Sequence, residues 1–350
     1  MNISNLYVPI ELIQYIFDFL EFINQLSFKL TCKDYNQLRI YNLYNIPIKF
    51  RNKLDDDILK NYPFLKYLNV KNNIKITNVK HMTNLQILDA SGFWCGIDDK
   101  GIKGLNLIKL NARGNSTITN VKHMTNLQIL DASGYNCGIN DQSIKNLNLV
   151  QLNTSANYNI TNISHMTHLQ ILDAYDCRIN DQSIKNLNLI QLNANCNQNI
   201  TCVSHMTNLQ ILHACGYCGI NDLSIKNLNL IQLNASGNPN ITNISHMTNL
   251  QILDASYDCG INDQSIKNLN LIQLNANFNR NITCVSHMTN LQILDAMNHC
   301  GIDNKGIKNI NLMELNISNN FKITDVSHMT NLQILNASNK CELMIKVLKI

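Results

Sequence analysis

A segment of about forty residues repeats along most of this chain, and no other feature constrains the fold as strongly. The string His-Met-Thr-x-Leu-Gln-Ile-Leu occurs seven times, with its histidine at positions 81, 123, 165, 205, 246, 287 and 328. Successive copies lie 40 to 42 residues apart, and this self-similarity indicates an array of stacked structural units. We therefore expect one continuous solenoid over most of the chain.

Each repeat divides into two shorter units that share one apolar pattern. The pattern Leu230-x-x-Leu233-x-Ala235 is typical of a short strand, because alternate side chains of a strand point to opposite faces. The leucines that open the units lie 20 to 22 residues apart, at positions 65, 85, 107, 127, 149, 169, 189, 209, 230, 250, 271, 291, 312 and 332. The sequence thus predicts fourteen coils with strands in a parallel sheet.

The turn after each strand carries either Asn or Cys. Asn stands eight residues after the leading leucine in every first-type unit, at positions 73, 115, 157, 197, 238, 279 and 320. The second-type units place Cys eight to ten residues after it, at 95, 137, 177, 218, 259, 300 and 341. We expect the Asn amides to bond backbone groups of the turn and of the next coil, since an unpaired buried group costs about 1–3 kcal/mol.

The outer side of the coils is expected to alternate between short helices and tighter turns. After Cys177, the apolar residues Ile179, Ile184 and Leu187 fit one face of a short helix, with Asn180 or Asp181 as its N-cap. The first-type units instead carry a short, β-branched segment, which favours 3₁₀-like turns.

These features together resemble the cysteine-containing leucine-rich repeats, over residues 54–350. The resemblance implies an α/β fold, a leucine-rich-repeat solenoid of about 14 repeats of 20–22 residues with a parallel sheet on its concave side. The segment Leu54–Leu59 looks like the helical half of an incomplete first repeat, and residues 343–348 are expected to cap the far end.

Residues 5–38 do not share the repeat. Pro9 stands where a helix can begin, and Leu12, Ile16 and Leu20 follow at helical spacing. The apolar pattern breaks near Asn24-Gln25 and then resumes. Some 35 residues cannot bury this much apolar surface alone, so the segment is expected to pack on a partner or a neighbouring domain.

This segment resembles the F-box, with a hydrophobic-Pro-x-Glu start, spaced Leu and Ile, and a late apolar-x-Cys followed by an aromatic residue. Val8, Leu30 and Tyr35 depart mildly from the usual residues. The division is then a helical F-box module at 1–45 and a solenoid with terminal caps at 46–350. An alternative is that residues 1–50 only cap the solenoid.

The resemblance implies the substrate-recognition subunit of an SCF-type (Skp1-cullin-F-box) E3 ubiquitin ligase. The F-box would bind a Skp1-like adaptor, and through it the cullin-RING complex, while the repeats hold the target protein. The residues carried over to adaptor binding are Val8, Pro9, Leu12, Ile13, Ile16, Leu20, Leu26 and Leu30. The alternative function is a non-catalytic interaction scaffold or decoy that is not coupled to a ubiquitin ligase.

Two rows of side chains are candidate target-binding sites on the concave face or the rim. The first is the outward strand-end row of Asp89, Asp131, Asp173, His213, Asp254 and Asp295, which alternates with Asn. The second consists of aromatic residues just after the strands: Phe93, Trp94, Tyr135, Tyr175, Tyr217 and Tyr257. The alternatives are that neighbouring Asn side chains satisfy the Asp residues, and that the rings only shield the solenoid edge.

No catalytic constellation stands out, so we expect no enzyme, cofactor or metal. Equivalent repeat histidines would be about 10 Å apart, too far for a shared zinc. A zinc set of Cys196, His213, Cys215 and Cys218 remains an alternative, although Cys218 belongs to the inward cysteine series.

Charge and targeting signals point to a protein partner inside the cell. The formal net charge is +4 and no Arg-rich run occurs, so nucleic acid is not expected. The start Met1-Asn2-Ile3 lacks a secretory signal, and no apolar run is long enough to span a membrane. We expect a cytoplasmic or nuclear protein with reduced cysteines. The Asn, Ile and Lys bias fits the AT-rich genome of a large DNA virus, with action in the host cytoplasm, or of a protist.

Overall fold

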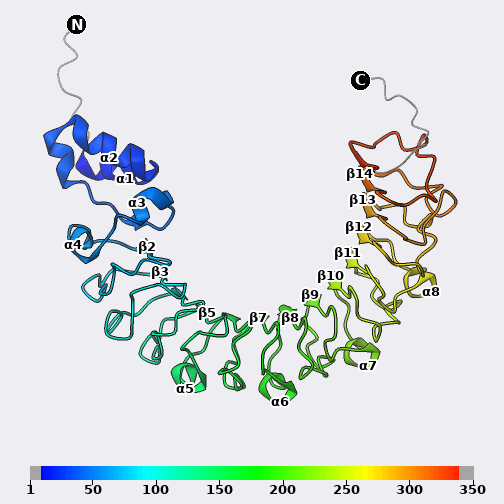
Figure 1. Cartoon of the computed structure of the whole chain (residues 1–350), viewed down its shortest axis with the longest axis horizontal. Coiled ribbons are helices and arrows are strands. Elements are labelled where there is room, and N and C mark those ends of the chain that lie inside the picture. The colour runs from blue at the N-terminus through cyan, green and yellow to red at the C-terminus, as the bar shows by residue number, and fades with distance from the viewer. Residues whose placement is uncertain (1–8, 339–350) are drawn as a thin grey trace, which may run out of the picture. The chain divides into compact units, whose positions relative to one another are not determined.

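The computed structural model describes residues 9–338 of the chain. It contains two compact units that divide between Asn153 and Thr154. Within each unit the chain winds in successive coils, with strands on one side and loops or short helices on the other (Figure 1). The expected C-terminal cap at 343–348 and Cys341 lie outside the described residues.

The first unit begins with the helices α1 (Ile10–Asp18) and α2 (Phe22–Thr31) and the 3₁₀ helix η1 (Lys33–Gln37). Pro9 is the N-cap of α1, as predicted. The predicted break at Asn24-Gln25 is wrong, because the helices part earlier, between Asp18 and Phe22. Gln25 is instead buried inside α2, where its amide donates to the carbonyl of Phe17 at 3.0 Å. A polar residue there satisfies a helix-end carbonyl rather than ending a helix.

The solenoid starts one coil earlier than its leading leucines indicate. Strand β1 (Asn42–Leu43) pairs in parallel with β2 (Tyr67–Asn69), and helix α3 (Ile48–Arg51) lies between them. The predicted helix at 54–59 is present as α4 (Asp56–Leu59), capped by the Asp55 side chain.

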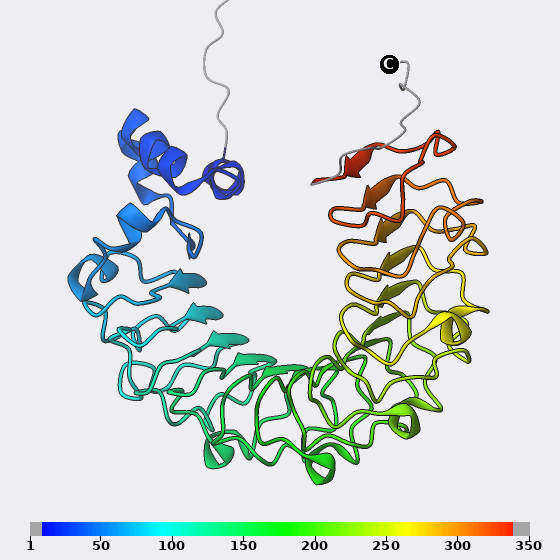
Figure 2. The same ribbon diagram turned by 45° about the vertical axis from the view of Figure 1, so that its right-hand side comes forward.

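The strands pair in chain order in each unit, leucine opposite leucine, and stack in parallel (Figure 2). The first unit continues with β3 (Ile87–Asp89), β4 (Lys109–Asn111), β5 (Ile129–Asp131) and β6 (Gln151–Asn153). The second holds β7 (Ile171–Asp173), β8 (Gln191–Asn193), β9 (Ile211–His213), β10 (Gln232–Asn234), β11 (Ile252–Asp254), β12 (Gln273–Asn275), β13 (Ile293–Asp295), β14 (Glu314–Asn316) and β15 (Ile334–Asn336). The fourteen leading leucines are between 0 and 9% exposed and form the core.

Short helices follow the cysteines in four coils: α5 (Asp141–Ile144), α6 (Asp181–Ile184), α7 (Asp222–Ile225) and α8 (Asp263–Ile266). Asn180 caps α6, and Asp181 has a different role: its carboxylate accepts from the backbone N–H and hydroxyl of Thr201 on the next coil, at 2.8 and 2.5 Å. The coils at 98–101 and 303–306 form turns instead of the expected helices. At Gly101 a Cβ would lie 2.2 Å from the Thr77 carbonyl oxygen, so a residue with a side chain does not fit this backbone position.

The predicted Asn ladder forms, but its amides donate to the preceding coil rather than to the next one. The Asn238 amide, which is fully buried, donates to the carbonyl oxygens of Ala214 and Ile220 on the preceding coil, at 2.9 and 3.1 Å. Asn279 makes the same pair with Ala255 and Ile261. The cysteines of the other series are also buried, from Cys95 at 7% exposed to Cys300 at 0%. The Asn amides thus bond backbone carbonyls of the turns that would otherwise lack donors, and the cysteine side chains fill the space inside the other turns.

Candidate functional site

The strand-end Asp row lies at the carboxyl ends of the strands in both units, where the side chains bond their own main chain. Asp131 accepts from the Ser133 backbone N–H at 3.0 Å and from its hydroxyl at 2.6 Å, and Asp254 binds Ser256 in the same way. Asp89, Asp173 and Asp295 accept from backbone N–H groups two residues later, at 3.0, 3.1 and 3.1 Å.

These bonds explain why the row contains Asp and Asn. Both side chains can accept a backbone N–H two residues on, which closes an Asx turn at the end of a strand. The partners are therefore backbone amides, in place of the neighbouring Asn side chains considered from the sequence. Asp89 is buried, whereas the other members are half-buried and present part of each carboxylate to the open face.

His213 interrupts the row in the second unit. The backbone N–H of Cys215, two residues after His213, donates to the side chain of Asn195 on the preceding coil at 2.8 Å. Burial lowers the pKa of His213, and the negative charges of Asp173 and Asp254 partly oppose that shift. Burial also raises the pKa of Asp295.

The aromatic row is exposed in both units. In the first unit, the rings of Phe93 and Trp94 meet edge to face at 5.0 Å, and Trp94 and Tyr135 are each 63% exposed. In the second unit, Tyr257 stacks on Phe278 at 5.6 Å. The exposed rings of the whole row are Phe93, Trp94, Tyr135, Tyr158, Tyr175, Tyr217, Tyr257, Phe278 and Phe321. Large exposed rings held by their neighbours are typical of protein interfaces, and target binding by this row stays a prediction.

The zinc alternative finds little support in the geometry. Cys218 is 4% exposed and accepts from the Asn238 amide at 3.3 Å, so its thiol faces the core. Over residues 9–338, no three His, Cys, Asp or Glu side chains come together as a metal site.

The repeat histidines have a role that the sequence did not reveal. Nε2 of His205 lies 3.2 Å from the carbonyl oxygen of Ile184, at the end of α6. His246, His287 and His328 contact the matching carbonyls of the coils before them. The last carbonyls of a helix lack intrahelical partners, and the rings of His205, His246 and His287 contact such carbonyls at the ends of three short helices. His328 contacts the matching carbonyl in a turn.

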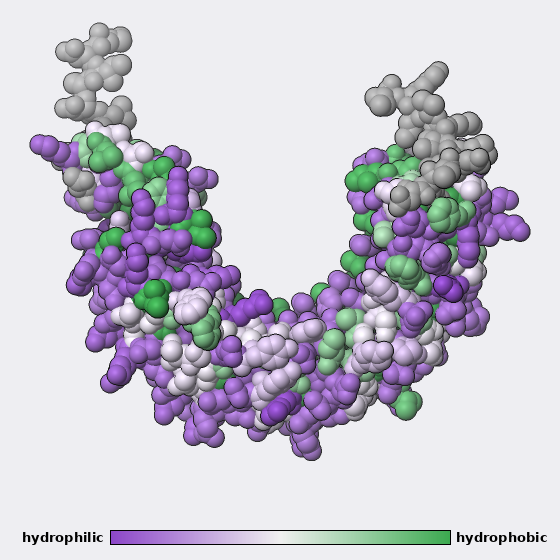
Figure 3. Space-filling view, in the orientation of Figure 1, coloured by the Kyte–Doolittle hydropathy of each residue, from purple (hydrophilic) through white to green (hydrophobic). Residues whose placement is uncertain are grey.

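The F-box helices expose a patch of apolar side chains (Figure 3). Of the predicted adaptor-binding residues, Leu12, Ile16 and Leu30 are 54, 56 and 88% exposed. Pro9 is also exposed, while Ile13, Leu20 and Leu26 are half-buried, and Val8 lies outside the described residues.

Two aromatic residues of this patch were not among those carried over to adaptor binding, although Phe19 shares the helical spacing of Leu12 and Ile16. Tyr15 and Phe19 are 64 and 74% exposed, and their rings meet edge to face at 5.0 Å. Their spacing of three residues from Leu12 and Ile16 places them on neighbouring turns of α1, a signal that was available in the sequence.

No helix within residues 9–338 has the length and apolar character that crossing a bilayer requires.

Solved structures with a similar arrangement are leucine-rich-repeat proteins. The internalin InlF of Listeria monocytogenes superposes with a TM-score of 0.52 at 22% identity, over 81% of this chain and 83% of that one. The functional domain of InlJ from the same organism, described as including a cysteine ladder, has a TM-score of 0.48 at 20% identity, over 81% of this chain and 65% of that one. The yeast Rad7–Elc1 complex gives 0.47 at 18% identity, over 93% and 92%. The likeness to InlF shows the fold: the chain forms a leucine-rich-repeat solenoid, and the predicted fold class is confirmed.

The N-terminal segment identifies the chain further. Residues 6–38 match the F-box domain family. The chain is therefore an F-box domain followed by a leucine-rich-repeat solenoid, and its buried cysteines fit the cysteine-containing type of repeat. A search of curated proteins finds no match. The combination supports a role in protein recognition.

Proposed function

We propose that this protein is the substrate-recognition subunit of an SCF-type E3 ubiquitin ligase. Its F-box binds a Skp1-like adaptor that connects it to a cullin-RING complex, and its solenoid holds the target. The observation that carries the proposal is the apolar patch of Leu12, Tyr15, Ile16 and Phe19 on α1, each more than half exposed. Contiguous exposed apolar patches of this kind mark sites where a protein binds a partner.

The chain contributes binding surfaces rather than catalysis. The buried cysteines are poorly suited to nucleophilic chemistry, since burial raises the pKa of the Cys137 and Cys259 thiols to about 11 and keeps them neutral. The His205 and His246 rings contact backbone carbonyls. Described cysteines that include Cys196 and Cys202 are free thiols, which is consistent with action in the cytoplasm or nucleus.

The adaptor contact is tested by co-purification of the full chain with Skp1 and the cullin N-terminal region. We expect a stable complex with the unaltered chain and at least a tenfold weaker one with Ile16→Asp, because a charge placed in an apolar interface loses its hydration. Leu223→Asp is the matched control, since Leu223 is 74% exposed on α7 in the solenoid. If the unaltered chain fails to bind Skp1, or both variants bind equally well, the scaffold or decoy function replaces this proposal.

The target side is tested separately on the aromatic row. Trp94→Ala combined with Tyr135→Ala is expected to weaken capture of a validated target, because exposed rings often dominate binding energy. Ile74→Ala is the control, since Ile74 is 65% exposed in the same unit. Unchanged pull-down of the target by the double variant would remove these rings from the target-binding surface.

A further inference from the structure

One pocket on the rim of the second unit differs in charge from the matching places in the other coils. Residues Arg280, His299 and Lys322 line it. The residues 41 positions earlier are Pro239, Asp258 and Asn281, with a formal charge of −1. The pocket residues carry +2 with His299 neutral, because Arg280 and Lys322 each add one positive charge. Near-identical copies have thus diverged toward positive charge on three adjacent coils.

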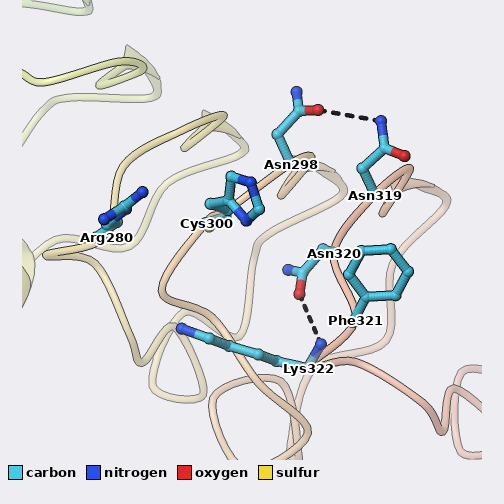
Figure 4. Close-up of a pocket in the computed structure, with 8 residues that line it drawn as sticks. Arg280, Asn298, Cys300, Asn319, Asn320, Phe321 and Lys322 are labelled. Carbon is cyan, nitrogen blue, oxygen red and sulfur yellow. Dashed lines mark hydrogen bonds between the residues drawn. The ribbon is translucent and has the colours of Figure 1, made fainter.

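The pocket has a defined shape. Its volume is about 350 Å³, and it lies between the coils of Arg280 and Phe321 (Figure 4). The Lys322 side chain extends from its own coil toward that of Cys300. The positive charge of Lys322 acts on the Cys300 thiol and partly opposes the rise in its pKa that burial causes.

The upper edge of the pocket is fixed by amides. The Asn319 side chain donates to Asn298 at 3.2 Å, and Asn298 donates to Asn277 at 2.7 Å (Figure 4). The rings of His299 and Phe278 make a T-shaped contact, with their centroids 6.5 Å apart. A site whose walls are held in place loses little entropy when a ligand binds.

We propose that this rim pocket binds an acidic side chain of a partner polypeptide, with the carboxylate between Arg280 and Lys322 and an apolar neighbour against Phe321. The guanidinium offers planar paired donors that match a carboxylate, and the ammonium adds a second charge. None of the eight lining residues is acidic. The neutral amides and thiol around them leave a positive field that favours an anion.

The inference rests on the proposed function in one respect, namely that the polypeptide is the target of the ligase. The test therefore uses the full chain without Skp1 or cullin, so that the pocket can succeed or fail independently of adaptor binding. A random-peptide phage library is selected on the unaltered chain, on Arg280→Gln with Lys322→Gln, and on Lys75→Gln with Arg113→Gln. The last variant is the matched control, because it removes the same charge and Lys75 occupies the Lys322 register in the first unit.

We expect Asp- and Glu-rich peptides to be enriched on the unaltered chain and the control, and to be lost on the pocket variant. Fluorescence anisotropy of an enriched peptide should show binding at least about tenfold weaker to the pocket variant than to the control. Replacing Glu by Gln in the peptide should have a similar effect. Peptides that depend on the pocket but lack acidic residues, equal losses in both variants, or no dependence on the pocket would each overturn the proposal. Tighter binding of the enriched peptide when its Glu is replaced by phosphoserine, measured by the same anisotropy assay, would overturn the assignment of a carboxylate.

Discussion

The F-box helices and the solenoid differ in the solvent exposure of their apolar side chains. On α1, Leu12, Ile16 and Phe19 are each more than half exposed. In the solenoid, Leu230 and Leu233 are fully buried, although their local sequence is no more apolar. The difference lies in what covers each element: every inner coil has a neighbour on both sides, whereas α1 has only one side covered by the rest of its unit.

The two regions also differ in how their polar groups are satisfied. In the solenoid the same set of bonds recurs between neighbouring coils, as with Asn238, which donates to Ala214 and Ile220 on the preceding coil. In the F-box helices the bonds do not repeat from one element to the next: Gln25 donates to the Phe17 carbonyl, and Gln14 bonds the backbone of Arg39. The comparison supports the proposal that a partner covers the exposed face of the F-box helices.

Among polar side chains, the largest effect is expected from the Asn ladder. Asn238→Ala should lower the free energy of unfolding by about 2–4 kcal/mol, because it leaves two buried carbonyls without donors. Asn234→Ala is the control on the same coil, where a half-exposed side chain accepts one N–H from Ser236, and it should cost under about 1 kcal/mol. Urea denaturation measures both. Equal losses would show that the ladder is not what holds the coils together.

An intermediate effect is expected from the buried cysteines at high pH. Burial raises the pKa of the Cys137 thiol to about 11 from an unfolded value of 9.0. Because the folded state holds the proton more tightly, this stabilisation is complete below pH 9 and is lost as the pH rises toward 11. Cys137→Ala should therefore reduce the fall in stability between pH 8 and pH 10 by about 1 kcal/mol. Urea denaturation at the two pH values measures it, and an unchanged pH dependence would contradict the burial of this thiol.

The smallest effect is expected in the F-box. Leu12→Ser with Ile16→Ser should change the unfolding free energy of the free chain by no more than roughly 0.5 kcal/mol, because both side chains are already in water. Leu233→Ala in the solenoid should cost about 2–5 kcal/mol. Thermal and urea denaturation compare the two. A large loss from the F-box variant would mean that the patch is part of a core rather than a binding surface.

Much of the fold could be predicted because the repeat multiplies weak signals. One Leu-x-x-Leu motif is ambiguous, but fourteen in register specify parallel strands, and the position of Asn238 identifies the turn. Local details depended on tertiary contacts that no single coil reveals. Gly101 and Gly306 stand where the four coils with short helices have serine, and the sequence alone did not show that these two coils form turns.

The candidate site was less accessible to sequence reasoning. The Asp row was identified as outward, but its bonds to the following backbone N–H groups, such as that of Ser133, became clear only from the turn geometry. The rim pocket depends on three residues from three coils, Arg280, His299 and Lys322. Residues so far apart in the sequence meet only when the register of the coils is known.

Amide hydrogen exchange of the free chain and of its Skp1 complex tests the central claim most directly. The account predicts that Skp1 slows exchange in α1 and α2, between Ile10 and Thr31, and leaves the coils of β8 to β14 unchanged. Protection in those coils without protection in α1 and α2, or no change anywhere on addition of Skp1, would contradict it.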